Sequence, residues 1–217
     1  MPWKQNYTAS DEVSLKDDEI NWPGDRRCCV AVNVDLSLAR APDGLVPSDL
    51  SDYRAMFGLH EGMNQLLATL ERYNIKATFT VPAAMANMLK DTLRELNANG
   101  HEVAPHGFKH EDVTALSRED EKARMELATE IMTDVLGRRP RGWYSLPRQS
   151  DPFAVGTISP NTAELLIEAG YSYMGSGLSD DIPHYWVADF EKRTAILTLP
   201  YFYHFDDQFF LLFPAKG

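Results

Sequence analysis

Three histidines and three acids crowd into residues 101–112, HEVAPHGFKHED, although the whole chain has only six histidines. His106 and His110 are four positions apart, a spacing that would place both rings on one face of a helical turn, where they could share a metal ion. Imidazole nitrogen binds zinc and other first-row metals, and a carboxylate would complete a ligand set with open positions. A divalent ion held there would acidify water and polarise a carbonyl, which is the chemistry of hydrolysis.

An aspartate at the end of another predicted strand can complete this set. Asp35 follows an apolar stretch, and the carboxyl ends of parallel strands meet at one edge of a sheet. We therefore expect the side-chain tips of Asp35, His106 and His110 to lie close enough to share one ion or water. The alternative is that the two histidines are ordinary surface or core residues, because pairs at this spacing also arise by chance. The neighbouring Glu102 and Glu111 are expected to face solvent.

Short segments rich in β-forming residues alternate along the chain with segments of helical periodicity. We predict strands at residues 28–35, 76–81, 101–105, 142–146, 171–174, 195–200 and 208–213. We predict helices at 60–75, 83–100, 117–136 and 159–170, with an irregular excursion over 41–58. Residues 1–25 show no sustained periodicity and are predicted to form an N-terminal arm, followed by one domain over 26–217. The alternation implies βαβ units and a mostly parallel α/β sheet, either doubly wound or closed into a barrel.

The helix predicted at 117–136 has recognisable ends. Ser117 is a candidate N-cap with Asp120 and Glu121 in the first turn, and Gly137 follows the last helical residue. The charged run SREDEKARMEL at its start is interpreted as a solvated helix face.

Composition narrows the classes of partner. The 217 residues include 32 acidic and 21 basic ones, a formal net charge of -11, which would repel the phosphate backbone of a nucleic acid. No run of about 18 apolar residues is present, so no membrane span is expected. The polar, acidic N-terminus lacks the pattern of a secretory signal, which favours a cytoplasmic protein. Cys28 and Cys29 are interpreted as buried core thiols, because neighbours on a strand point to opposite faces.

Several motifs together resemble one family. HGFKH after GHEVAPH, the aspartate-bearing first strand and the downstream RPRGWYSLP resemble the polysaccharide deacetylases, carbohydrate esterase family 4. The resemblance extends over about residues 26–214. It implies a distorted (β/α) barrel and a zinc or similar ion bound by one aspartate and two histidines. Asp35, His106 and His110 match these three ligands.

Other residues match the family's substrate groove. Residues 140–148 correspond to the loop that walls the groove, which implies substrate contacts for Trp143, Tyr144 and Arg148. The stretch SPNTAELLIEAGYSYMGSGLSDDIPHYW is similar to the branch that contains allantoinases and cyclic-imide hydrolases. That resemblance implies a small-molecule pocket lined by Asp180, Asp181, His184, Tyr185 and Trp186. Because this branch is metal-independent, both a divalent metal, zinc above all, and no metal are consistent with the resemblance.

Two departures from the family pattern concern catalysis. Deacetylases usually carry an aspartate general base where this chain has Asn33, whose amide cannot take up a proton at neutral pH. We therefore expect Asn33 to contact substrate and the water to be activated either by the metal alone or by another carboxylate. The resemblance supplies Asp180 and Asp181 as candidates for that base. The family's late catalytic histidine belongs to a strand beyond Gly217, and His204 lies too early to replace it. Because the apolar last segment, QFFLLFP, would leave an open sheet edge, we expect a homo- or hetero-oligomer, unless the sequence is a shortened one.

The resemblance implies a hydrolase of a non-peptide carbon–nitrogen bond. The lack of a secretory signal favours a small soluble amide, ureide or imide as substrate over cell-wall polysaccharide, and an N-acetylated sugar is the further candidate. The alternative is a non-catalytic binding or regulatory subunit that keeps the deacetylase fold, which Asn33 and the missing late histidine favour.

Overall fold

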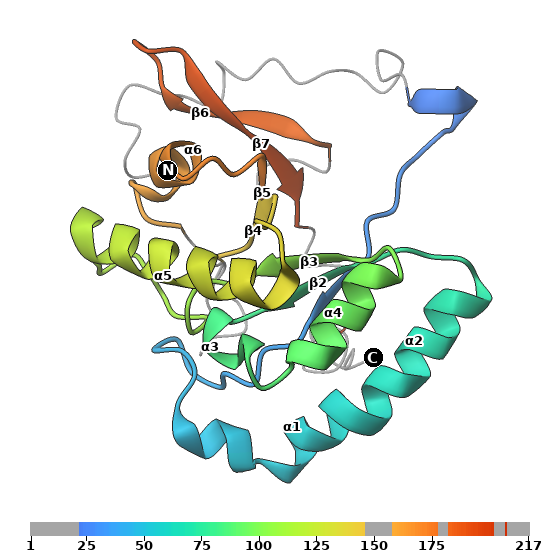
Figure 1. Cartoon of the computed structure of the whole chain (residues 1–217). Helices are drawn as coiled ribbons and strands as arrows, with labels where there is room; N and C mark the ends of the chain where they lie inside the picture. The colour runs from blue at the N-terminus through green and yellow to red at the C-terminus, as the bar shows by residue number, and fades with distance from the viewer. Residues whose placement is uncertain (1–21, 146–157, 178–181, 202–206, 208–217) are drawn as a thin grey trace, which may run out of the picture. The chain divides into compact units, whose positions relative to one another are not determined.

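The computed structural model describes residues 22–145, 158–177, 182–201 and 207 of a chain that divides into two units, residues 1–32 and 33–217. In the described part of the larger unit, one sheet has the order β1-β2-β3, with strands Asn33–Asp35, Thr78–Val81 and Glu102–Pro105. A second sheet has the order β4-β5-β7-β6, with strands Gly142–Trp143, Tyr173–Gly177, Thr194–Pro200 and His184–Asp189. All neighbouring strands are parallel except β6 and β7, which pair antiparallel (Figure 1).

Helices lie in the connections from β1 through to β5. They are η4 Pro47–Ser51, α1 Tyr53–Phe57, the π-helical turn η5 Gly58–Gly62, α2 Met63–Arg72, α3 Ala83–Ala86, α4 Lys90–Ala98, α5 Arg118–Leu136 and α6 Thr162–Glu168. The smaller unit contributes the 3-10 helix η3 Pro23–Asp25. α4 and α5 contact β3, and α6 contacts β6 and β7. Within the described ranges, no helix is both long and apolar enough to cross a bilayer.

The two sheets are joined by backbone pairing just after the ends of β3 and β4. His106, directly after β3, forms a parallel bridge with Tyr144, directly after β4. The backbone N–H of His106 donates to the carbonyl of Val81 at 2.8 Å, and that of Gly107 donates to the carbonyl of Tyr144 at 2.9 Å. The described parallel strands therefore follow one another as β1-β2-β3-β4-β5-β7, which confirms the predicted α/β fold of barrel type.

Side chains of the first sheet alternate between an apolar face and a polar inner face. Phe79, Val81 and Val103 are fully buried in the core. The strand register places Asn33 beside Thr78 and Asp35 beside Thr80. Because paired residues of parallel strands point to the same side, these polar side chains share the inner face.

Two glycines make room for tyrosine rings on this inner face. A Cβ atom at Gly142 would lie 2.0 Å from the ring of Tyr173, and one at Gly175 would lie 2.0 Å from the ring of Tyr144. The two rings pack edge to face with centroids 6.4 Å apart. Only glycine permits this approach, and it brings the Tyr144 hydroxyl to β1, where it donates to Asn33 Oδ1 at 3.1 Å.

The first predicted strand is shorter than expected. β1 begins at Asn33, and the described residues 22–32 contain η3 but no strand. Cys28 and Cys29 are exposed free thiols, so the prediction that they are buried core thiols is wrong. They lack the strand neighbours that would bury them. The strand predicted at 208–213 lies outside the described residues.

β6 is a strand that the alternation of segments did not indicate. It forms a hairpin with β7 around residues 190–193, where the carboxylate of Asp189 accepts the N–H groups of Glu191 and Lys192 at 2.9 and 3.0 Å. This turn contains no glycine or proline, and Arg193 adopts a left-handed φ of 54°. The usual sequence markers of a hairpin are therefore absent here.

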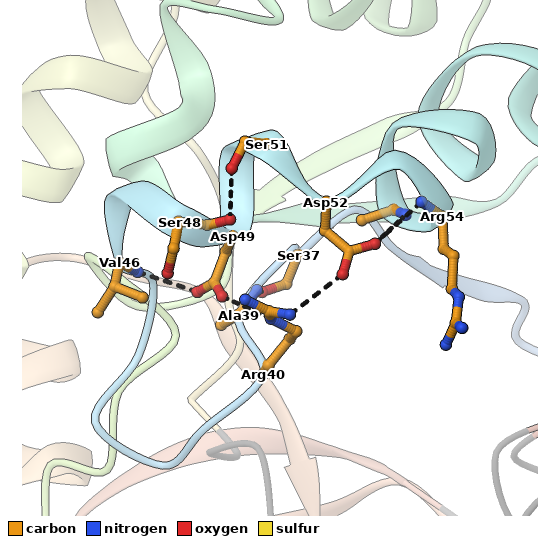
Figure 2. A network of polar contacts seen from close by, with 10 residues as sticks. Ser37, Ala39, Arg40, Val46, Ser48, Asp49, Ser51, Asp52 and Arg54 are labelled. Atoms are coloured by element: carbon orange, nitrogen blue, oxygen red, sulfur yellow. Dashed lines mark hydrogen bonds and ion pairs between the residues drawn. The ribbon is translucent and has the colours of Figure 1, made fainter.

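The segment after β1 is more regular than predicted. Residues 41–58 were expected to be irregular, but they contain η4 and α1. Asp52 caps α1 by accepting the N–H groups of Arg54 at 2.9 Å and Ala55 at 3.3 Å. Figure 2 shows the Arg40 guanidinium between Asp49 and Asp52, with distances of 2.7 and 3.1 Å. Hydrogen bonds and ion pairs among residues 40–55 therefore stabilise helical turns in a segment that was predicted to be irregular.

The helix predicted over 83–100 is two helices, α3 and α4. Between them, the N–H groups of Met88 and Leu89 both donate to the carbonyl of Met85, at 3.0 and 3.2 Å. This tight turn interrupts the helical path, and the apolar spacing on either side does not reveal it.

The ends of α5 agree with the prediction, but one of its faces does not. The Ser117 hydroxyl accepts the N–H of Asp120 at 3.0 Å, and Gly137 ends the helix with a left-handed φ of 70°. Glu121, in the run expected to be solvated, is buried and accepts hydrogen bonds from the hydroxyls of Ser159 and Thr162. The SPNT stretch therefore anchors the start of α6 to α5.

Replacing Glu121 by glutamine should change how stability depends on pH. Burial raises the pKa of Glu121 above its ordinary value of 4.5, although its hydroxyl hydrogen bonds act in the opposite direction. An acid whose pKa is higher in the folded state contributes stability below its unfolded pKa and loses it as the pH rises through the folded pKa. In urea unfolding between pH 4 and pH 7, the Glu121→Gln variant should therefore gain stability relative to the parent as the pH rises.

Glu126→Gln, at an exposed position of the same helix, is the matched control and should follow the parent at every pH. The difference in unfolding free energy between Glu121→Gln and the parent could instead stay constant with pH to within about 0.5 kcal/mol, the range of an ordinary surface substitution. That result would show that the pKa of Glu121 does not change on folding.

Candidate metal centre

One aspartate and two histidines from separate segments converge at the ends of β1 and β3. Asp35 is the last residue of β1, His106 follows β3, and His110 lies four residues further on. Their candidate ligand atoms all lie within 4.8 Å of one another. His106 Nδ1 is 3.3 Å from Asp35 Oδ1, and His110 Nδ1 is 3.8 Å from Asp35 Oδ2. The predicted convergence of these side chains is therefore confirmed.

The two histidine rings meet through a turn. Their centroids are 3.7 Å apart with 28° between the ring planes. Gly107 and His110 have left-handed φ angles of 63° and 59°, which a right-handed helix excludes. The expectation that the rings share one face of a helical turn is therefore wrong, although the rings do come together.

The loop after β1 is tied to this turn by backbone hydrogen bonds. The N–H of Leu45 donates to the carbonyl of Lys109 at 2.7 Å, and the N–H of Asp112 donates to the carbonyl of Pro42 at 2.8 Å. A Cβ atom at Gly44 would lie 2.6 Å from the Lys109 carbonyl oxygen, so the close approach requires glycine. The segments that carry Asp35 and His110 are thereby held together.

The two glutamates expected to face solvent are partly or fully buried. Glu111 is 5% exposed, and its side chain pairs with Arg124 of α5 at 3.0 Å. The Glu102 side chain is 15% exposed and pairs with Arg141 at 2.8 Å. The prediction is wrong for both residues because basic partners distant in sequence cover them. The burial of Glu111 beside the candidate metal centre, and its pairing with Arg124, are what sequence reasoning missed.

Asp35 stays ionised at this site. Burial would raise its pKa, but the two neighbouring imidazole rings and the hydrogen bonds from His106 and from the Ser37 N–H (2.9 Å) outweigh that effect. The pKa of Asp35 therefore lies below its ordinary range. Its side chain is 35% exposed, whereas those of His106 and His110 are 10% and 5% exposed. A carboxylate thus faces solvent on one side and two enclosed imidazoles on the other.

These donors fit a divalent ion. Ligand bonds of 2.0–2.2 Å around a tetrahedral zinc ion place neighbouring donors about 3.4 Å apart. The two nitrogen–oxygen distances of 3.3 and 3.8 Å are close to that value. Two imidazoles with one carboxylate are also a donor set that leaves a position open for water or substrate.

Two residues expected to contact substrate adjoin these ligands. Asn33 lies two positions before Asp35 on the same face of β1 and accepts the hydrogen bond of Tyr144 at 3.1 Å. The Tyr144 ring lies edge-on to His106, with centroids 6.5 Å apart. Burial raises the pKa of Tyr144 to about 12, so its hydroxyl remains a hydrogen-bond donor at neutral pH.

The remaining predicted site residues are not all gathered here. Trp143 is buried and packs edge to face on Tyr171 with centroids 5.3 Å apart, on the opposite side of the strand from Tyr144. On β6, His184 and Trp186 share one face, whereas Tyr185 is 71% exposed on the other. The structure therefore does not bring these three β6 residues into a single pocket. Arg148, Asp180 and Asp181 lie outside the described residues.

Comparison with known proteins identifies relatives of the chain. Residues 32–174 match the protein-family model described as polysaccharide deacetylase. The chain is 28% identical over 141 residues to a peptidoglycan deacetylase of Helicobacter pylori. The aligned region covers 65% of this chain and 45% of that protein. It resembles the solved structure of a "probable polysaccharide deacetylase" from Pseudomonas aeruginosa, with 25% identity, a TM-score of 0.68 and coverage of 83% of this chain and 64% of that one.

A second solved structure, Puue allantoinase, shares the fold at 23% identity and a TM-score of 0.69, again over 83% of this chain and 64% of that one. These likenesses confirm the predicted barrel type. The chain spans less than half the length of the Helicobacter pylori relative.

Asp35→Asn should remove most of the metal affinity while keeping the shape of the side chain. The parent is expected to bind one Zn²⁺ per chain in isothermal titration calorimetry. The Asp35→Asn variant should bind Zn²⁺ more than about 100-fold more weakly. Removing a group that only orients a ligand lowers metal affinity by up to about 100-fold, so removing a ligand itself should lower it more. Asp91→Asn, at an exposed position at the start of α4, should bind zinc like the parent. Equal affinities for parent and Asp35→Asn would exclude Asp35 as a ligand.

Proposed function

Because the chain belongs to the polysaccharide deacetylase family, we propose that it is a metal-dependent hydrolase of a carbon–nitrogen amide bond. The observation that carries this proposal is the cluster of Asp35, His106 and His110 at the carboxyl ends of β1 and β3. In the proposal these three residues are the metal ligands, and zinc is the metal that the donor set favours. A bound divalent ion would acidify water and polarise the amide carbonyl.

The substrate is proposed to be an N-acylated amino sugar or a small soluble amide, ureide or imide. The Helicobacter pylori relative, a peptidoglycan deacetylase by name, supports the N-acyl sugar. The resemblance of residues 159–186 to enzymes of small ureides and imides supports the second class. Substrates of both classes contain an amide carbonyl, the group that a metal ion at the carboxyl ends of the strands would polarise.

The residues around the site differ in whether they can accept a proton during the reaction. Asp35 is held as a carboxylate by the neighbouring imidazoles, so it supplies charge and does not take up a proton. The Tyr144 hydroxyl donates a hydrogen bond to Oδ1 of Asn33. This bond fixes the orientation of the Asn33 amide, so its nitrogen can donate a hydrogen bond to substrate. Neither Asn33 nor Tyr144 can be the general base at neutral pH. We assign that role to Asp180 or Asp181.

A non-catalytic binding subunit is the second candidate function, and one observation favours it. The position of the usual family base is occupied by Asn33, which engages Tyr144. In that case the site around Asn33 and the two histidines would bind an amide ligand without hydrolysing it.

Turnover assays separate the two functions. The parent should hydrolyse at least one member of a panel of N-acetylglucosamine oligomers, peptidoglycan fragments, allantoin and cyclic imides, and zinc should stimulate the reaction. His106→Ala should lower kcat/KM by more than about 10³-fold, whereas Asp91→Asn should leave it unchanged. Tight zinc binding without turnover of any panel member would instead support the binding subunit.

The base assignment has its own test. Removing a general base typically lowers the rate by 10²–10⁴-fold, so Asp180→Asn or Asp181→Asn should reduce kcat within that range and leave zinc affinity unchanged. Full activity in both variants would refute the assignment. The exposed Asp91→Asn variant again serves as the control.

A further inference from the structure

The turn that carries His110 is held along its outer side by three backbone hydrogen bonds. The carbonyls of Gly107 and Phe108 accept the N–H groups of Ala83 at 3.2 Å and Ala84 at 2.9 Å. The carbonyl of Lys109 accepts the N–H of Leu45 at 2.7 Å. Every carbonyl between the two histidines is therefore fixed by α3 or by the loop after β1.

A single buried carboxylate holds the same turn from within. Glu111 Oε2 accepts the N–H of Lys109 at 2.5 Å, and Glu111 Oε1 accepts a hydrogen bond from the guanidinium of Arg124 at 3.0 Å. A Cβ atom at Gly107 would lie 3.6 Å from Glu111 Oε2, which places this oxygen under the turn. The carboxylate thus joins the turn to α5.

This arrangement needs Arg124. A buried carboxylate is costly unless a charged partner and hydrogen bonds compensate for its lost hydration. The Glu111 side chain is 4% exposed, whereas that of Arg124 is 39% exposed. Arg124 can therefore compensate the charge of Glu111 while keeping part of its own hydration.

The backbone of His110 needs such support as well. A left-handed conformation is uncommon for a residue with a side chain, and it persists where the surroundings over-determine it. His110 has a φ of 59°, and Glu111 follows it directly. If the turn relaxed to ordinary φ values, the His110 ring would leave its stacked position 3.7 Å from the His106 ring.

We propose that Glu111, held by Arg124, is a positioning residue that fixes the turn 107–110 so that the His110 ring stacks on His106 and faces Asp35. Through this pair, α5 sets the geometry of the metal centre without touching it. The link from this geometry to metal affinity and catalysis rests on the proposed function, whereas the ring geometry itself does not.

The first test observes the rings directly. The chain has six histidines, and labelling their Cε1 atoms with ¹³C gives one NMR signal for each, assigned by single substitutions. In metal-free Glu111→Gln and Arg124→Met, the signals of His106 and His110 should shift because each ring sits in the magnetic field of the other. The signals of His60 and His101 should not shift.

Arg124→Lys and two α5 variants are the controls. Only one nitrogen of Arg124 contacts Glu111, so the lysine ammonium can replace it and should restore the parental signals. Arg118→Met removes a surface ion pair of the same helix, the 2.6 Å contact with Glu168, and should leave His106 and His110 unchanged. Glu126→Gln should do the same. These variants separate a loss of helix stability from a loss of ring position.

Zinc titration provides the second readout. Glu111→Gln and Arg124→Met should bind Zn²⁺ about 10–100-fold more weakly than the parent, as is typical when a group that orients a ligand is removed. Should Glu111→Gln fail to fold, the half-buried Arg124 still allows the test through Arg124→Met. Unchanged histidine signals in a folded variant would overturn the proposal. A parent that binds no zinc would refute the metal centre, while the histidine signals would still decide the positioning role.

Discussion

The contact of one carboxylate with two imidazole rings is the constraint on which the rest of the structure depends. Asp35 and the two histidines are 71 and 75 residues apart in sequence, yet their ligand atoms lie within 4.8 Å of one another. The parallel register of β1, β2 and β3 brings the strand ends to one edge. The left-handed turn after β3 then folds His110 back over His106. Each ring lowers the free energy of the Asp35 carboxylate, which offsets the cost of its partial burial.

The inner face of the sheet shows how the Asn33 side chain is held. Gly142 and Gly175 leave space for two large rings, and the Tyr144 hydroxyl reaches Asn33 across the sheet. Burial keeps that hydroxyl protonated, so it is suited to a neutral amide partner. The glycines, the tyrosine and the asparagine are therefore parts of one arrangement.

α5 connects this site to the remainder of the fold through two buried acids. Glu121 receives the hydroxyls of Ser159 and Thr162 and so positions the start of α6. One turn further along, Arg124 reaches Glu111 under the histidine turn. A helix that the charge pattern describes as solvated thus has one face that organises two separate loops. The sequence does not reveal this role, because a buried acid cannot be distinguished from a solvated one until its partner is known.

Local signals in the sequence predicted most of the described strands and helices, the ends of α5 and the three residues that converge at the candidate metal centre. Caps, glycines and apolar spacing act over a few residues, so they can be read without the fold. The failures have two causes: partners that lie outside the local segment, and local turns that lack the usual sequence markers. Burial of Glu111 depends on Arg124, thirteen positions away, and the interruption between α3 and α4 depends on a local turn that apolar spacing does not mark. The hairpin of β6 forms without glycine or proline, because Asp189 caps its turn. Only the tertiary structure decided which acids are buried and how the histidine rings meet, since both depend on contacts between residues that the chain brings together from a distance.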